Sequence, residues 1–461
     1  MKKRLLYCGL ILLSPTLLCQ LSTNANAQKV ACGGQHSVFL CSDSIANGWG
    51  SNTYGQLANS SGTTNVPVTA TPINRITNIG AGINHTIALR DDSTIWAWGI
   101  NLTGELGNGT TTGSNTPTQV VGLTSVVSIS SMFHSLALLS DSTVYSWGNN
   151  QFGELGNGTS NGFSSVPVLV SNLSGMTHIQ AGYYHSLAIR SDSTIWTWGY
   201  NGAGELGNGL NMNSDIPVQV VGISNAVAIA GGNSFSCAIR ADSTVWSWGN
   251  NFEGELGNGL NINSNVPVQV SGLTGIIAIN AGVYHTLALK SDGTVWTWGF
   301  NLYGQLGNGN NTDSNIPVQV SGLTDIVGIA AGYAHSLAME NDGTAWAWGY
   351  NSTGQLGNGS FADSNIPVQV NSLCLGVIGV NEINSPLTIS VFPNPIEKEF
   401  IVKGTKAKGE IVLVDLMGKE IKKQITLDEE TKINSEQLLP GIYMLIYKME
   451  NKIATQKLVK F

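Results

Sequence analysis

Six histidines recur at nearly equal intervals in this chain of 461 residues, and histidine is the commonest metal ligand in proteins. They hold one slot in successive repeats: His36, His85, His134, His185, His285 and His335. Phe235 takes the slot in the remaining repeat, and ligands a whole repeat apart cannot converge on an ion at about 2 Å. We therefore expect no metal site, and a hydrogen bond from each imidazole to a neighbouring turn. His178 lies outside the slot and is expected to be solvated.

A second repeated motif, Gly-Glu-Leu-Gly-Asn-Gly at residues 104–109, has the glycines of a phosphate-binding loop. It lacks the lysine and the following helix that such a loop needs, so the glycines are expected to supply positive φ in a tight turn. Its carboxylates recur with the repeat, so none forms a distinct catalytic pair: Glu105, Glu154, Glu205 and Glu255. The motifs predict no catalytic residue and no cofactor.

The elements that carry these residues are short β-strands in a sevenfold repeat. Trp-Gly pairs follow one another at spacings of 49 to 51 residues, beginning at Trp49, Trp98, Trp147, Trp198, Trp248, Trp298 and Trp348. Each unit contains four short apolar or alternating segments, separated by Gly, Asn, Asp and Ser. This pattern predicts an all-β protein with a seven-bladed β-propeller over residues 28–376. All 12 tryptophans belong to the Trp-x-Trp-Gly element and are expected to pack between blades.

The repeats resemble the regulator-of-chromosome-condensation family over roughly residues 29–373. The shared motifs are Ala-Gly-x-x-His-Ser/Thr-Leu-Ala, Asp-x-Thr-Val/Ile-Trp-x-Trp-Gly and Gly-Glu/Gln-Leu-Gly-Asn-Gly. The resemblance implies a seven-bladed propeller that acts as an interaction platform. The chromatin role of the founding member is not expected here, because residues 28–376 carry 18 acidic and 6 basic side chains, a net charge of -12. Such a field repels nucleic acid.

Residues that vary between repeats are the candidates for recognition. If the strands of a blade are antiparallel, the first and third strands of every blade end on one face of the ring. The variable aromatic residues near those ends are Tyr54, Phe133, Phe152, Tyr183, Tyr184, Tyr200, Phe252, Tyr284, Phe300, Tyr303, Tyr333 and Tyr350. Aromatic side chains at exposed turns are enriched in binding sites. We interpret this face as a binding site for a protein or glycan; packing at the blade edges is the alternative.

Two other functions remain open at this stage. One is a hydrolase or lyase acting on surface polysaccharide, with acids in the central channel; Asp215 and Glu253 are the non-repeated acids considered for it. The other is a structural or adhesive surface layer without a discrete ligand. Whatever its function, we expect the protein to be a monomer.

Four cysteines remain if the N-terminal segment is removed. Cys237 replaces leucine in a strand and is expected to be a buried thiol. Cys41 ends the second strand of the first blade and Cys374 follows the last strand of the ring, so both lie on the face opposite the aromatic residues. The sequence predicts a Cys41–Cys374 disulfide that joins the first blade to the last, in an exported chain where disulfides are permitted.

The first 27 residues have the pattern of a secretory signal peptide. Lys2, Lys3 and Arg4 precede an apolar run from Leu5 to Leu18, and small residues at Ala25 and Ala27 predict cleavage before Gln28. Lipidation at Cys19 is the alternative. The apolar run is short for a membrane span, and no other segment of the chain is long and apolar enough to be one, so the mature protein is expected to be exported.

The composition changes at about residue 377, where tryptophan disappears and lysine and glutamate become frequent. We interpret residues 377–384 as a linker and residues 385–461 as a small C-terminal β-sandwich. This segment resembles the C-terminal sorting domain of the Bacteroidota type IX secretion system, through Phe392-Pro-Asn-Pro, Asp415-Leu-Met-Gly-Lys, Leu439-Pro-Gly-Ile-Tyr and Lys457-Leu-Val-Lys. The resemblance implies the type IX machinery as a partner and attachment to the cell surface.

Overall fold

The computed structural model describes residues 29–371, 373–374, 389–394, 396, 398–403, 409–415, 420–426, 430–449 and 452–460. The chain divides into two compact units, Met1–Cys374 and Leu375–Phe461. The expected signal peptide (1–27) and linker (377–384) lie outside the described residues. Every regular element within those ranges is a β-strand. No helix in this part of the chain has the length and apolar character needed to span a bilayer.

The first unit contains seven four-stranded sheets in the described residues, each built from consecutive strands. The first sheet comprises β1 (Lys29–Cys32), β2 (His36–Leu40), β3 (Ala46–Gly50) and β4 (Thr64–Thr69). The second comprises β5 (Ile76–Ala81), β6 (His85–Arg90), β7 (Ile95–Gly99) and β8 (Ser114–Gln119). The third comprises β9 (Val126–Ser131), β10 (His134–Leu139), β11 (Val144–Asn150) and β12 (Gly162–Leu169).

The other four sheets repeat this pattern. The fourth comprises β13 (Met176–Ala181), β14 (His185–Arg190), β15 (Ile195–Gly199) and β16 (Ser214–Gln219). The fifth comprises β17 (Ala226–Gly231), β18 (Phe235–Arg240), β19 (Val245–Gly249) and β20 (Ser264–Gln269). The sixth comprises β21 (Ile276–Ala281), β22 (His285–Lys290), β23 (Val295–Gly299) and β24 (Ser314–Gln319). The seventh comprises β25 (Ile326–Ala331), β26 (His335–Glu340), β27 (Ala345–Gly349) and β28 (Ser364–Gln369).

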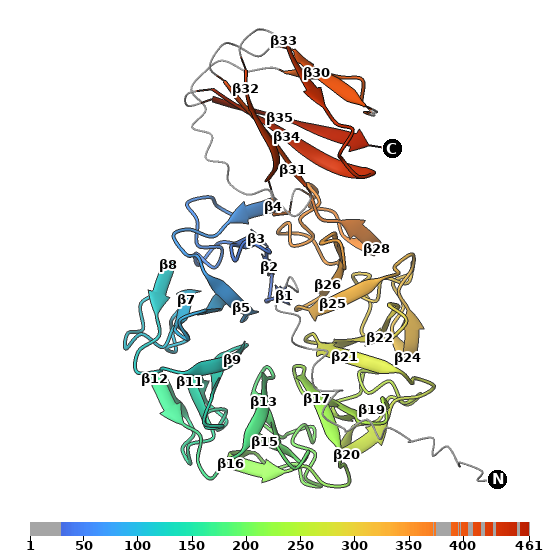
Figure 1. The fold of residues 1–461 in the computed structure, drawn as a ribbon. Helices are drawn as coiled ribbons and strands as arrows, with labels where there is room; N and C mark the ends of the chain where they lie inside the picture. Colours follow the sequence, from blue (N-terminus) through green and yellow to red (C-terminus); the bar gives the residue numbers. More distant parts are fainter. Residues whose placement is uncertain are drawn as a thin grey trace, which may run out of the picture. The chain divides into compact units, whose positions relative to one another are not determined.

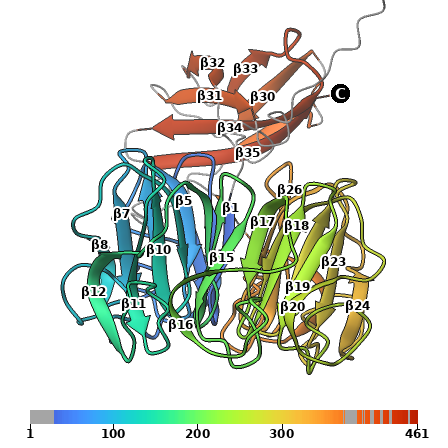
Figure 2. The same ribbon diagram turned by 90° about the horizontal axis from the view of Figure 1, so that it is seen from below.

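The seven sheets are the blades of a closed ring (Figure 1). The first strand of each blade lies innermost and contacts the first strand of the next, and β1 contacts β25, so the first blade meets the seventh. Figure 2 shows the strands of the blades running between the two faces of the ring. The all-β fold class and the seven-bladed propeller predicted from the repeat are confirmed.

Burial explains the strand pattern. The second strand of a blade is covered on both sides by neighbouring blades, and all of its residues but the last are buried, as in β22. The fourth strand lies at the outer edge, and its residues are partly or fully exposed, as in β24. The hairpin between the second and third strands is closed by an aspartate whose carboxylate accepts the N–H of the threonine two residues later, as Asp292 does from Thr294 at 3.1 Å.

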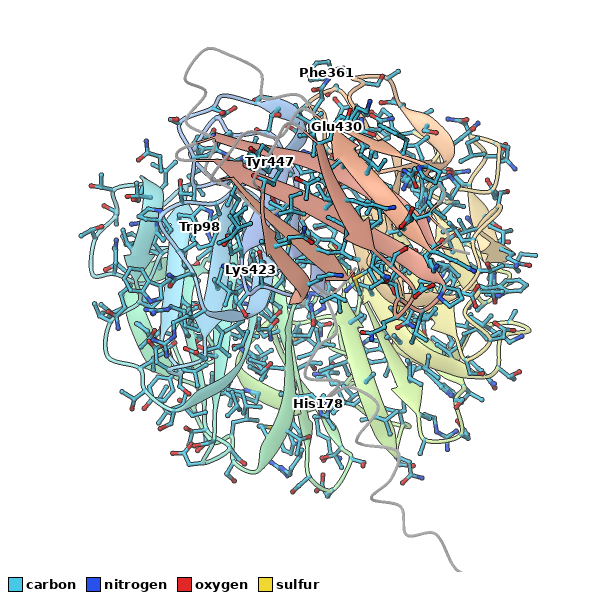
Figure 3. All side chains as sticks on the ribbon, turned by 45° about the horizontal axis from the view of Figure 1, so that its top comes forward. Trp98, His178, Phe361, Lys423, Glu430 and Tyr447 are labelled. Carbon is cyan, nitrogen blue, oxygen red and sulfur yellow. A yellow bond between two sulfur atoms is a disulfide. The ribbon has the colours of Figure 1, made fainter. Side chains whose placement is uncertain are left out.

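The core of the ring consists of separate apolar clusters, one at each junction between blades. The cluster between blades five and six, for example, combines Cys237 and Leu256 with Trp298. The second tryptophan or its equivalent in every blade is buried there, including Trp98, labelled in Figure 3. Its indole N–H donates to a carbonyl of the preceding blade at 2.7–3.0 Å at all seven junctions. The expected role in inter-blade packing is therefore observed for these seven tryptophans, whereas the first tryptophan of the paired motif is partly exposed, as at Trp96.

The second unit folds separately into two sheets. One contains β29 (Ser390–Phe392), β30 (Glu399–Lys403) and β33 (Glu430–Asn434); the other contains β32 (Glu420–Ile425), β31 (Glu410–Asp415), β34 (Gly441–Met449) and β35 (Lys452–Lys460). Phe400 and Ile433 of the first sheet share one buried cluster with Leu413, Leu445 and Tyr447 of the second. Two sheets around one core make a small β-sandwich, as the sequence predicts.

Candidate ligand-binding face

The turns that carry the variable aromatic residues share one end of the blades. In the fourth blade His185 pairs with Gly199, so the turn before β14 and the turn after β15 open at the same end. The sixth blade repeats this register with His285 and Gly299. We call this end of the ring the aromatic end, defined by the twelve aromatic residues named above. Each of the twelve is partly buried or exposed, and none is fully buried.

Five of these residues, from blades three and four, form a continuous group that we call cluster A: Phe133, Phe152, Tyr183, Tyr184 and Tyr200. Tyr184 is at its centre. Its ring centroid lies 5.2 Å from that of Phe133, 5.5 Å from Phe152 and 4.9 Å from Tyr183. Phe152 also contacts Tyr200 at 4.9 Å. These spacings are typical of stabilising aromatic pairs.

Five others, from blades six and seven, form cluster B: Tyr284, Phe300, Tyr303, Tyr333 and Tyr350. Tyr284 lies 5.9 Å from both Phe300 and Tyr333, centroid to centroid. Tyr303 links Phe300 at 6.3 Å to Tyr350 at 4.8 Å. The structure therefore gathers ten of the twelve predicted residues into two groups.

The tyrosines of the two clusters affect one another's pKa values. Burial raises the pKa of Tyr183, and the hydroxyls of Tyr184, Tyr333 and Tyr284 raise it further. Tyr184 in turn contributes to the raised pKa of Tyr284. The remaining two predicted residues lie outside both clusters: Tyr54 and Phe252 are 46% and 69% exposed, and neither makes a ring contact with another of the described aromatic residues.

A buried glutamate or glutamine supports the turn at the aromatic end of each blade. One Oε atom of Glu154 accepts the backbone N–H of Phe152 at 2.7 Å, and Gln305 accepts that of Tyr303 in the same way at 3.1 Å. Because either side chain supplies the acceptor, the slot can hold Glu, as in blades two to five, or Gln, as in blades one, six and seven. The other oxygen of Glu154, like that of Glu205, is buried without a partner, and burial raises the pKa of both carboxyls to about 7. Glu154 and Glu205 therefore have a structural role, which is to stabilise the turns at the aromatic end.

The central channel differs from the expectation of an acid-lined catalytic site. It is a space of about 150 Å³ between the first strands, and its polar lining consists of Ser130, Ser131, Gln180 and Asn280. No carboxylate is among the described residues that line it. The two candidate acids lie elsewhere, since Asp215 is on the outer strand β16 and Glu253 follows β19. Acids placed on outer strands and turns cannot reach the axis, so this expectation is wrong.

The repeated histidines form a belt between blades. Each imidazole is buried, and its Nε2 lies 2.6–3.3 Å from a Ser or Thr hydroxyl on the second strand of the next blade. The partner is thus a strand residue, and the expected bond to a turn is wrong. Ser236, for example, donates its own proton to the Glu205 carbonyl at 2.8 Å, so His185 must carry its proton on Nε2.

The structural context of the other predicted residues is also clear. No three His, Cys, Asp or Glu side chains in the described ranges are grouped to hold a metal. His178, labelled in Figure 3, lies outside the buried belt, is partly exposed and contacts the Thr177 hydroxyl at 3.1 Å. Cys237 is fully buried. The sulfurs of Cys41 and Cys374 are bonded at 2.11 Å, the pairing that the sequence predicts.

Comparison with known families accounts for both units. The RCC1-like domain family matches residues 11–225, and the regulator of chromosome condensation (RCC1) repeat matches residues 242–289, 292–339 and 342–380. The secretion system C-terminal sorting domain matches residues 390–460. The chain carries an RCC1-like repeat domain and a C-terminal sorting domain. No curated protein matches it.

Solved structures share the fold of the RCC1-like repeat domain. Yeast RCC1 (Prp20), from its complex with Kap60, aligns with a TM-score of 0.66 and 21% identity, over 81% of this chain and 90% of that chain. Prp20p of Saccharomyces cerevisiae, in a second structure, gives 0.65 and 21%, over 77% and 90%. Human WBSCR16 gives 0.63 and 22%, over 75% and 94%.

One irregular site in the RCC1-like ring was not found from the sequence. A pocket of about 460 Å³ lies between blades three and four and is lined by Gln151, Phe152, Ser160, Asn161, Asn213 and Asp215. Only Phe152 was a predicted binding residue, and Asp215 was considered for a different role. The 51-residue spacing between Trp147 and Trp198 was the available signal, because the extra residue lies in this part of the third repeat.

Proposed function

We propose that this protein is exported to the cell surface and that its RCC1-like ring binds a protein or glycan through the aromatic end. The observation that carries the proposal is the gathering of ten non-repeated aromatic side chains into clusters A and B. Residues that occur in every blade maintain the propeller, whereas the aromatic residues of clusters A and B vary from blade to blade. Rigid, partly exposed Tyr and Phe side chains supply large contact area at low entropic cost and are typical of binding hot spots.

Replacing Tyr183, Tyr184 and Tyr284 together by alanine should weaken capture of the ligand by at least about tenfold, since hot-spot aromatics contribute about 2 kcal/mol or more each. Capture is measured on a glycan array and from host or environmental extracts with the immobilised protein. The matched control replaces Ile216, Ile316 and Ile366, three exposed residues of the outer strands. Capture that survives the tyrosine changes would contradict the proposal, and an absence of any saturable binding would favour the surface-layer alternative.

The sorting domain supports export by the type IX secretion route. We propose that residues 1–27 direct entry into the periplasm and that the C-terminal domain directs passage across the outer membrane and attachment at the surface. The family match over residues 390–460 supports this assignment, and so does the separate core of the second unit, which lets the domain act as a detachable module. Nucleic acid is not a proposed partner, given the net charge of -12 over residues 28–376.

Deleting residues 385–461 should leave the propeller in the periplasm, because the remaining chain keeps its own core but lacks the sorting domain. Fractionation of cells of the producing organism, with protease shaving of intact cells, measures the location. The control replaces the exposed Ile421 and Ile425 of the second unit by serine, which leaves the buried core intact. Undiminished surface display of the truncated chain would refute the assignment.

A further inference from the structure

At three junctions, the outer rim of the aromatic end is closed by a pair of asparagines. The first asparagine of the fourth-strand segment donates its side-chain N–H to an asparagine in the loop of the preceding blade. Asn265 donates to Asn211 at 2.9 Å, Asn315 to Asn261 at 2.6 Å and Asn365 to Asn311 at 2.8 Å. These bonds tie each loop to the next blade at the junctions four–five, five–six and six–seven.

The junction between blades three and four is built differently on both sides. Asp215 replaces the donor asparagine, and Ser160 replaces its partner in the loop. The third blade also has one extra residue in this loop, where Asn161 adopts a positive φ of 64°. Its strands β11 and β12 are longer and pair as far as Asn150 with Gly162. The asparagine pair is thus replaced by the pocket of about 460 Å³.

The lining of this pocket combines one aromatic ring with polar groups of both kinds. Gln151, Asn161 and Asn213 each contribute a carboxamide to the lining, and Ser160 adds a hydroxyl. Asn161 Nδ2 donates to Ser160 Oγ at 3.1 Å, and Asn213 Oδ1 accepts the backbone N–H of Asn201 at 2.9 Å. Among the described residues this leaves the Gln151 carboxamide, the Asn161 carbonyl oxygen and the Asn213 amide N–H groups for a ligand. The Asp215 side chain has no hydrogen-bond or ion-pair partner among the described residues, so its acceptors are available. Phe152, a member of cluster A, connects the pocket to the aromatic end.

We propose that this pocket binds a neutral hexopyranose unit of a glycan. A sugar ring presents an apolar C–H face that stacks on an aromatic side chain, and vicinal hydroxyls that both donate and accept hydrogen bonds. The amides and Asp215 match the hydroxyls, and Phe152 matches the C–H face. The volume lies within the range of about 300–1,000 Å³ that is usual for small-ligand sites. This inference rests on the proposed function and names glycan as its ligand class.

Charge and hydrogen-bonding capacity distinguish this ligand from the alternatives. An acidic sugar would meet the Asp215 carboxylate within a ring of net charge -12 and would be repelled. A lysine or arginine side chain would use the carboxylate and the aromatic ring, but it has no acceptor for the free amide N–H groups of Gln151 and Asn213. A neutral polyhydroxylated ring can bond to the Asp215 carboxylate, to these N–H groups and to the free carbonyl oxygens of Gln151 and Asn161.

The test is titration calorimetry of the full chain with cellotetraose, maltotetraose, mannotetraose and a β-1,4-linked galactotetraose. At least one should bind saturably. Asp215→Asn, which restores the residue common at this slot, should weaken that binding by at least about tenfold, the loss expected for one hydrogen bond to a charged group. Phe152→Ala should weaken it similarly. The matched control Asn65→Asp places a carboxylate in the same slot at the junction of blades seven and one, and should bind as the unmodified protein does.

The outcomes separate this assignment from the proposed function. Binding that falls with Asp215→Asn and is unchanged by Asn65→Asp supports the pocket. The assignment is overturned if none of the four sugars binds, or if both pocket variants bind normally. It is also overturned if only tetra-arginine binds in a manner that depends on Asp215. A further outcome is that the alanine variant of Tyr183, Tyr184 and Tyr284 loses capture of the ligand while Asp215→Asn and Phe152→Ala still bind it. In that case the aromatic end retains its proposed function and the pocket assignment fails.

Discussion

Lowering the pH from 6.5 to 4.5 should destabilise the ring by several kcal/mol. The six belt histidines are buried, and burial lowers the pKa of His185, for example, to about 3, compared with 6.5 for a free imidazole. The pKa of His85 is lowered less, to about 4, because Glu105 partly offsets its burial. The unfolded chain therefore takes up protons that the folded chain cannot. Each histidine contributes stability that is present above pH 6.5 and lost on acidification, about 2 kcal/mol over this interval.

Three buried glutamates act in the opposite direction, and burial also raises the pKa of the third, Glu255. The pKa values of Glu154 and Glu205 are raised by burial from 4.5 to about 7, so their contribution to stability is present below pH 4.5 and lost as the pH rises through 7. Between pH 6.5 and 4.5 each offsets about one histidine. Glu255 offsets part of a further one, so the net uptake on unfolding is at most about four protons, equivalent to at most about 5 kcal/mol per pH unit at its steepest. A loss of this size is comparable to the whole stability of an ordinary domain.

Thermal unfolding followed by calorimetry across this pH interval measures the effect. His185→Gln is the informative variant, because glutamine keeps an N–H donor toward the Ser236 hydroxyl but does not titrate. It should reduce the pH dependence by about one proton. Blade five shows that a non-titrating side chain is tolerated in the slot, since Phe235 occupies it. A melting temperature that stays constant from pH 6.5 to 4.5 would show that the imidazoles are not buried as described.

The fold was predictable because its determinants are local and repeated. Each strand is short, and each turn uses Gly, Asn, Asp or Ser. Because the pattern occurs seven times, it can be recognised even where one copy departs from it. Four strands in sequence order per blade leave little freedom in topology. The disulfide also followed from this order, because strand direction alone places Cys41 and Cys374 at the same end of the ring.

The partners of individual side chains were less predictable, because they belong to the neighbouring blade. His185 and Ser236 are 51 residues apart, and only the stagger between two blades brings the imidazole to a strand hydroxyl. The Glu154 slot shows the same limit: its repetition indicates a structural role, but its burial and raised pKa depend on the blade packed over it. The pocket at Asp215 arises from substitutions in two blades, Ser160 in blade three and Asp215 in blade four. Their effect can be predicted only when it is known that the two positions face each other across the junction.

Breaking the Cys41–Cys374 disulfide should lower the free energy of unfolding by up to about 5 kcal/mol. The bond closes a separation of 333 residues, and in the chain-entropy model a loop of this size restricts the unfolded chain strongly. Its position adds to the effect. The two cysteines lie in the apolar cluster that joins blade one to blade seven, with Phe39 and Trp49. This is the junction where the ring closes between the two ends of the repeat array.

Denaturant unfolding with and without reductant measures the effect, and the variant in which both Cys41 and Cys374 are alanine provides the control. Reductant should destabilise the natural protein and leave the double variant unchanged. Cys32 and Cys237 are free and buried, so they remain as thiols in both proteins. Reduction of the denatured natural protein should raise its thiol count by two. An unchanged thiol count, or equal stability of the two proteins, would show that ring closure depends on inter-blade packing alone.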